Sequence, residues 1–219
     1  MQTRDERKTS LWDGWNSPPN LVTYSRIVLV LIFIGFDIAA GAWGAQNVGM
    51  RWTAAVLFVI AASTDKLDGW MARTYNQVTE LGKLMDPIAD KLLILATLVV
   101  ASAFGEVYWW VTVLFIIREL GITVMRFFVI DTGGKVIAAS QAGKYKTLTE
   151  CIGLAMLLAP VWSLAADGSD ATWVNVYNIA TQVIIYIALV LCLYSGGEYL
   201  VNTFGRRAAA SSADDNQSA

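Results

Sequence analysis

The stretch that decides the fold runs from residue 65 to residue 90 and reads DKLDGWMARTYNQVTELGKLMDPIAD. It holds four aspartates, Asp65, Asp68, Asp86 and Asp90, within a chain of 219 residues that is 56% hydrophobic. Acids are rare in apolar segments because an unpaired charge is costly to bury. Residues three or four positions apart share one face of a helix, as each of these two pairs does. The spacing predicts two helix ends that present four carboxylates to each other across a short turn.

Four facing carboxylates repel one another unless cations lie between them. Oxygen ligands favour Mg²⁺ or Mn²⁺, and the chain contains no histidine, a common zinc ligand. Two such ions about 3.5–4 Å apart form a clamp for displacement at phosphorus. We therefore expect a site for two divalent cations. The alternative, against which the regular spacing argues, is a solvated loop whose acids pair with Lys66, Arg73, Lys83 and Lys91.

Long apolar runs make up most of the remaining chain. With only 16% charged residues, the composition is typical of a membrane protein. A spanning helix needs about 20 mostly apolar residues, and four runs reach that length: 21–43, 107–130, 145–165 and 174–200. Two shorter runs, 52–63 and 92–104, reach it if helix continues to about Arg73 and starts from about Lys83. The sequence predicts an all-α, polytopic membrane protein with six transmembrane helices in one domain, residues 20–203.

Basic residues fall on one side of this layout. With six spans both termini share a side, and that side receives all of the 16 Lys and Arg residues except Arg51. Because cytoplasmic loops carry the excess of basic residues, we expect both termini and the active site in the cytoplasm, at the cell (inner or plasma) membrane. Residues 1–19 are expected to form a cytoplasmic segment with a short interfacial helix around Trp12 and Trp15, or else an irregular linker. A disordered tail is expected over residues 204–219.

The aspartate stretch resembles the signature of the CDP-alcohol phosphotransferase family. The matching residues are Asp65, Asp68, Gly69, Ala72, Arg73, Gly82, Asp86 and Asp90. Members are polytopic membrane enzymes, typically dimers of six-helix subunits. They transfer a phosphatidyl or phosphoalcohol group from a CDP-linked donor to an alcohol and release CMP. The resemblance implies a homodimer among membrane lipids, two divalent cations (Mg²⁺ or Mn²⁺) as cofactors, and no nucleic-acid partner.

The resemblance also implies roles for individual residues. Asp90 would be both a metal ligand and the catalytic base for the acceptor hydroxyl, beside the metal ligands Asp65, Asp68 and Asp86. Contacts with the donor, CDP-diacylglycerol, would come from Asn20, Gly69, Arg73 and Thr79. These roles agree with the chemistry, since phosphoryl transfer asks mainly for charge neutralisation and positioning.

A second polar cluster bears on the acceptor. Arg118 and Arg126 lie in the fourth apolar run, about two helical turns apart, and Lys135 and Lys144 follow. An arginine within a membrane span is a candidate functional residue, so we expect these four residues to bind an anionic acceptor. The alternatives are a salt bridge of Arg118 with Glu119 or another acid, and an ordinary topological role for the lysines.

Three segments are similar to family members whose acceptor is sn-glycerol 3-phosphate: residues 72–91, IRE at 117–119 and GKYKT at 143–147. The function implied is metal-dependent transfer of a phosphatidyl group from CDP-diacylglycerol to sn-glycerol 3-phosphate, giving phosphatidylglycerophosphate and CMP in phospholipid biosynthesis. Cardiolipin synthases and phosphatidylinositol phosphate synthases of the same family are alternatives. A cation transporter is a more distant alternative, because intramembrane carboxylates often mark ion paths. Transporters, however, place such groups near the bilayer midplane, whereas the four aspartates are expected at helix ends.

Overall fold

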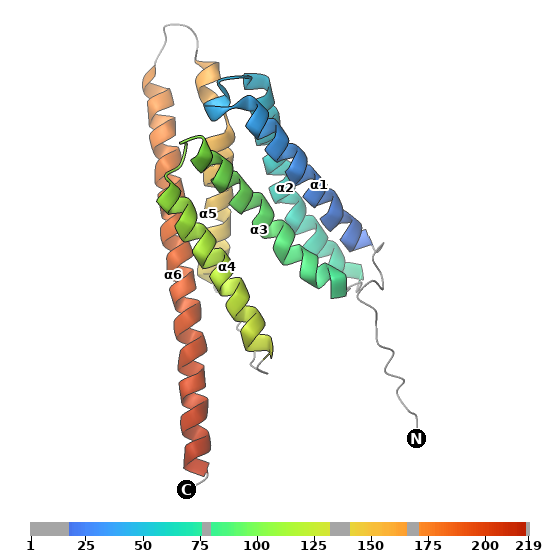
Figure 1. The fold of residues 1–219 in the computed structure, drawn as a ribbon, viewed down its shortest axis with the longest axis vertical. Helices are drawn as coiled ribbons and strands as arrows, with labels where there is room; N and C mark the ends of the chain where they lie inside the picture. The colour runs from blue at the N-terminus through green and yellow to red at the C-terminus, as the bar shows by residue number, and fades with distance from the viewer. Residues whose placement is uncertain (1–17, 76–79, 132–140, 166–170, 218–219) are drawn as a thin grey trace. The chain divides into compact units, whose positions relative to one another are not determined.

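The computed structural model describes residues 18–75, 80–131, 141–165 and 171–217 (Figure 1). Every regular element in these residues is helical, which confirms the predicted all-α class. The α-helices are α1 (Pro18–Ala40), α2 (Val48–Tyr75), α3 (Glu80–Ala103), α4 (Trp109–Asp131), α5 (Gln141–Leu158) and α6 (Ala171–Gln217). Two short 3-10 helices, η1 (Ala42–Gly44) and η2 (Val161–Leu164), follow α1 and α5. The chain divides into two compact units, Met1–Ala96 and Thr97–Ala219.

In the first unit, α1 packs along α2. Each helix buries residues at alternating spacings of three and four, which form one stripe. The apolar members of the two stripes are Val30, Phe33 and Ala40 of α1, and Ala54, Phe58 and Ala61 of α2. The rings of Phe33 and Phe58 meet with their centroids 5.7 Å apart at an angle of 59°. The apolar stripes therefore hold the two helices together as a hairpin.

Glycines shape the turn between α1 and α2. Gly41 has a φ of 72°, a left-handed conformation that favours glycine and commonly ends helices. It stops α1 at Ala40, three residues before the end of the predicted apolar run. Gly44 has a φ of 75°, and a Cβ there would lie 2.8 Å from Cβ of Arg51. The turn thus depends on glycine for its backbone conformation and for the space beside Arg51.

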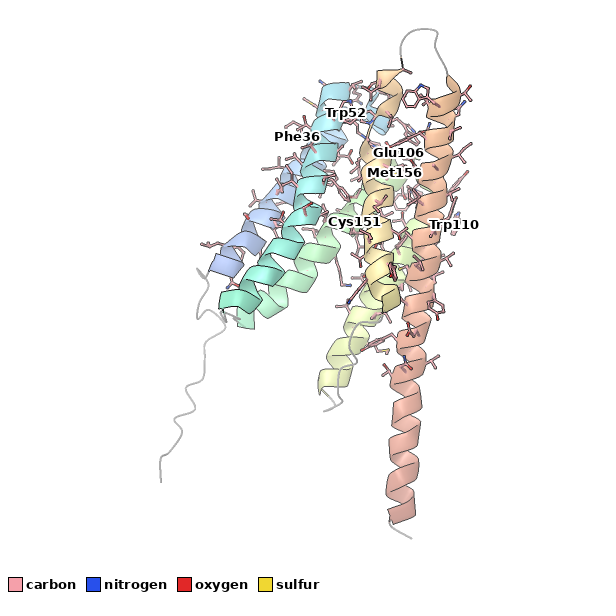
Figure 2. All side chains as sticks on the ribbon, turned by 180° about the vertical axis from the view of Figure 1, so that it is seen from behind. Phe36, Trp52, Glu106, Trp110, Cys151 and Met156 are labelled. Atoms are coloured by element: carbon pink, nitrogen blue, oxygen red, sulfur yellow. The ribbon has the colours of Figure 1, made fainter. Side chains whose placement is uncertain are left out.

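In the second unit, α6 packs along α5 and contacts α4. Gly153 of α5 permits the close approach, since a Cβ there would lie 3.1 Å from Cγ1 of Ile185. Near the start of α6, the hydroxyl of Tyr177 donates to the carbonyl of Met156 at 2.9 Å. Trp110 of α4 is labelled in Figure 2. Its ring stacks on that of Tyr186 of α6, with ring centroids 5.9 Å apart. These contacts attach α6 to both neighbouring helices.

Among the residues that the structure describes, two helices are long and apolar enough to cross a membrane, over Thr23–Ala40 in α1 and Thr172–Thr203 in α6. Val48–Thr64 and Lys91–Ala103 are shorter apolar helical segments. One side of α6 exposes large apolar side chains at helical spacing: Val176, Ile179, Val183, Ile187 and Val190. An outward apolar stripe of this kind suits contact with lipid, because lipid tails are as apolar as these side chains.

The predicted helices and the observed helices differ mainly at their ends. Helix does extend through the aspartate stretch, in α2 to Tyr75 and in α3 from Glu80. The predicted run 145–165 is too long, because α5 ends at Leu158, shortly before Pro160, and proline disfavours helix in the residue before it. Helix α6 continues to Gln217 through residues expected to be disordered, where Ala and Arg favour helix. The predicted interfacial helix lies outside the described residues.

Candidate active site

The four aspartates lie on two consecutive helices of the first unit. Asp65 and Asp68 belong to α2, and Asp86 and Asp90 belong to α3. Because both segments are helical, each pair shares one helical face. The side chains at these four positions lie outside the described residues, so this placement rests on the backbone. It agrees with the two-helix arrangement expected from the spacing.

The two aspartate pairs lie at similar distances along their helices from the short connection between α2 and α3. Only residues 76–79 separate Tyr75 from Glu80, which limits the distance between the two helix ends to about 18 Å. Helices α2 and α3 run in opposite directions (Figure 1). Asp68 precedes Tyr75 by seven residues and Asp86 follows Glu80 by six, so each stands about 10 Å along its helix from the connection. Because the two carboxylate pairs stand at similar distances from the connection on successive helices, they are suitably arranged for a shared site.

The donor set of this site fits hard divalent cations. Carboxylate oxygens are the ligands that Mg²⁺ and Mn²⁺ prefer. Among the side chains that the structure describes, no three His, Cys, Asp or Glu residues gather closely enough to hold a metal ion. The four carboxylates of the aspartate stretch remain the metal centre predicted from the sequence.

The expected donor-binding residues fall in the same unit. Gly69 and Arg73 continue α2 beyond Asp68. Asn20 lies in the first turn of α1, and its side chain is buried. Thr79 lies outside the described residues.

The expected acceptor-binding residues belong to the second unit. Arg118 and Arg126 are both in α4, and the side chain of Arg126 lies outside the described residues. Lys144 is exposed in the first turn of α5. Lys135 lies outside the described residues.

All three nitrogens of the Arg118 guanidinium donate hydrogen bonds within the protein. Nε donates to the carbonyl of Cys192 at 2.9 Å, Nη1 to Oε1 of Glu119 at 2.7 Å, and Nη2 to Oγ of Ser195 at 2.5 Å. Gly196 makes room for the side chain, since a Cβ there would lie 3.2 Å from Cγ of Arg118. The salt bridge with Glu119, which was the alternative expectation for Arg118, is present.

Sequence reasoning named Lys146 among the basic residues after Arg126 but missed its pairing with acids of α4 and α5. Nζ of Lys146 donates to Oε1 of Glu119 and lies 3.2 Å from Oε2 of Glu150. Lys146 and Glu150 are both buried on α5. The available signal was their spacing of four residues within an apolar run, which is typical of an ion pair on one helical face.

An apolar, all-α chain with paired aspartates on consecutive helices is the arrangement expected of a membrane enzyme that uses divalent cations in displacements at phosphorus. The chain belongs to the CDP-alcohol phosphatidyltransferase family, whose sequence pattern matches residues 16–194. This confirms the resemblance carried by the aspartate signature.

Individual relatives are similar over most of their length. The CDP-diacylglycerol--glycerol-3-phosphate 3-phosphatidyltransferase of Bacillus subtilis is 39% identical over 169 residues, covering 73% of this chain and 87% of the relative. The enzyme of the same name from Salmonella typhimurium is 34% identical over 186 residues, covering 83% and 92%. A probable phosphatidylglycerophosphate synthase of Mycobacterium tuberculosis is 36% identical over 181 residues, covering 83% and 78%.

Proposed function

We propose that this chain transfers the phosphatidyl group of CDP-diacylglycerol to sn-glycerol 3-phosphate, giving phosphatidylglycerophosphate and CMP. The observation that carries the reaction class is the pair of aspartates on each of α2 and α3. The choice of acceptor is supported by the relatives from Bacillus subtilis and Salmonella typhimurium, whose names state glycerol 3-phosphate. The family itself consists of phosphatidyltransferases, so the chain is an enzyme.

The reaction forms one bond to phosphorus and breaks another. A hydroxyl oxygen of glycerol 3-phosphate bonds to the phosphatidyl phosphorus, the bond from that phosphorus to CMP breaks, and CMP leaves with the electron pair. Asp90 accepts the proton of the attacking hydroxyl. Arg73 offers a forked, charged donor to the pyrophosphate, and Gly69 lets the donor approach the backbone of α2. Asn20 and Thr79 contact the nucleotide.

Two divalent cations, Mg²⁺ or Mn²⁺, supply charge neutralisation at the pyrophosphate when bound. Their ligands are Asp65, Asp68, Asp86 and Asp90. An all-carboxylate set supports this choice, because it favours oxygen-seeking cations.

The residues proposed to bind the acceptor's phosphate are Arg126, Lys135 and Lys144. The exposure of Lys144 supports this choice, because an exposed ammonium is available to a ligand. Arg118 was expected in the same set. Its three nitrogens already donate to Cys192, Glu119 and Ser195, which favours a supporting role for it.

The finer architecture is also a proposal: six spans over residues 20–203, both termini cytoplasmic, and a homodimer in the cell membrane. The apolar windows in α1 and α6 support spanning helices, and the distribution of basic residues supports the orientation. A single cysteine placed at position 168, in a chain lacking Cys151 and Cys192, should be labelled by an impermeant reagent from outside intact cells. Protection at position 168 together with labelling at position 218 would contradict the orientation.

The acceptor is tested with purified protein, CDP-diacylglycerol and Mg²⁺, by following CMP release. We expect release with sn-glycerol 3-phosphate, and none with phosphatidylglycerol or inositol phosphate. Asp90→Asn should abolish release and serves as the background control. Release only with phosphatidylglycerol would indicate a cardiolipin synthase, and release with no acceptor in the panel would contradict the proposed reaction.

A further inference from the structure

Four charged side chains are buried together in the second unit. Arg118 and Glu119 come from α4, and Lys146 and Glu150 come from α5, and none of the four side chains is more than 15% exposed. Oε1 of Glu119 accepts hydrogen bonds from both Arg118 and Lys146. One carboxylate oxygen therefore connects α4 to α5.

The same cluster reaches the third helix of the unit. Arg118 donates to the carbonyl of Cys192 and to the hydroxyl of Ser195, both on α6. Ser195 in turn donates to the carbonyl of Cys192 at 3.2 Å. The contacts of Arg118 and Glu119 thus join α4, α5 and α6.

The charges of the cluster cancel, because it contains two cations and two anions. Buried ions of this kind are retained only when they are paired. An anionic ligand needs available positive donors. The three nitrogens of Arg118 already donate to Glu119, Cys192 and Ser195, and Lys146 is paired with Glu119 and Glu150. The cluster is therefore suited to holding helices in place and not to binding a phosphate itself.

The ion pair of Lys146 with Glu119 constrains the rotation of α5 about its own axis, together with the packing of α5 along α6. Lys144 and Lys146 are two residues apart, which corresponds to about 200° around a helix. Lys146 is buried and Lys144 is exposed, in agreement with this geometry. Any rotation of α5 that released Lys146 would also displace Lys144.

We propose that Glu119 and Lys146 are positioning residues for the acceptor. Their ion pair locks α4 to α5 and keeps Arg126 and Lys144 in the register in which they bind the acceptor's phosphate. This proposal rests on the proposed function, in which the acceptor is an anionic alcohol. Its physical basis is that a misplacement of about 1 Å at a binding group can reduce the rate of an enzyme about 100-fold.

The test removes the α5 half of the cluster in the double variant Lys146→Met/Glu150→Leu. Arg118 and Glu119 remain paired with each other, and replacing a buried ion pair by apolar residues of similar volume is often tolerated. Oε1 of Glu150 has no hydrogen-bond partner in the described part of the chain, so this replacement loses little hydrogen bonding. The matched control is Thr149→Val, because the Thr149 hydroxyl donates to the carbonyl of Tyr145 on its own helix, at 2.8 Å.

We expect the double variant to raise the KM for glycerol 3-phosphate about tenfold or more, the scale seen when a supporting residue behind a ligand group is lost. The KM for CDP-diacylglycerol and the melting temperature should stay at the wild-type values, and the control should change neither KM. If the double variant does not fold, Glu119→Gln is measured with the same criterion for the two KM values, and its melting temperature is expected to fall because Arg118 and Lys146 lose their shared carboxylate.

An unchanged KM for glycerol 3-phosphate would overturn the positioning role, and so would a parallel rise in both KM values. In either case a wild-type enzyme that releases CMP with glycerol 3-phosphate would leave the proposed function intact. A wild-type enzyme that cannot use glycerol 3-phosphate would overturn both proposals.

Discussion

Arg51 and Asp37 form a buried ion pair across the turn between α1 and α2. Nη1 of Arg51 donates to Oδ1 of Asp37 at 2.5 Å, and the two side chains are 1% and 2% exposed. Arg51 is the basic residue that lies on the far side in the predicted topology. Its charge is neutralised inside the protein. Arg51 therefore does not conflict with the rule that cytoplasmic loops carry the excess of basic residues.

Arg51→Ala should destabilise the protein by about 3–5 kcal/mol, because it leaves the Asp37 carboxylate buried without its cation. The measurement is thermal or denaturant unfolding of the purified protein in detergent. The double variant Asp37→Leu/Arg51→Met should recover most of the loss, since no charge is then left unpaired. A double variant as unstable as Arg51→Ala would show that the pair is not the cause.

Removal of divalent cations should abolish activity, because the four aspartates of α2 and α3 need cations to bind a pyrophosphate. CMP release should stop in excess EDTA and return with Mg²⁺ or Mn²⁺. Asp86→Asn should stop release at all cation concentrations, whereas Asp214→Asn, near the end of α6, should behave as wild type. Full turnover in EDTA would exclude a metal-dependent mechanism.

Arg73→Ala and Arg126→Ala should weaken the binding of different substrates. Loss of a charge-assisted hydrogen bond costs about 1.5–3 kcal/mol, which corresponds to roughly ten- to a hundredfold in affinity. Arg73→Ala should raise the KM for CDP-diacylglycerol by that factor, and Arg126→Ala the KM for glycerol 3-phosphate. Lysine at either position should restore only part of the lost affinity, because a point charge cannot replace a forked donor. Equal effects of one variant on both KM values would count against separate donor and acceptor sites.

Gly153→Val should weaken the packing of α5 on α6. A Cβ at position 153 would lie 3.1 Å and 3.2 Å from side-chain atoms of Ile185 and Ile184, and overpacking typically costs about 1–3 kcal/mol. Gly121→Val is the matched control, because it lies in α4 and, in the described part of the chain, no atom beyond its chain neighbours and its own helix backbone lies within 4 Å of its Cβ position. Both variants share the cost of a β-branched residue in a helix, so the difference between their unfolding free energies measures the contact with α6. No difference would mean that α5 can move away freely.

The candidate metal centre could be predicted from the sequence, since the signal is local. Helical periodicity alone places Asp65 with Asp68, and Asp86 with Asp90, on shared faces. Residues 76–79 alone connect α2 to α3, so the ends of the two helices that carry these pairs lie near each other. The early end of α5 could also have been predicted, because Pro160 lies within the apolar run 145–165.

The helical class, the candidate metal ligands and the family were determined by the sequence itself, because they depend on spacings of a few residues and on the lengths of apolar runs. The partners of the buried charges were decided only by the tertiary structure. Arg118 meets Cys192 across 74 positions and Ser195 across 77, and Lys146 meets Glu119 across 27. A sequence shows that a charge stands in an apolar helix and must be paired, but helix packing selects the partner, because only packing brings distant positions within hydrogen-bond distance.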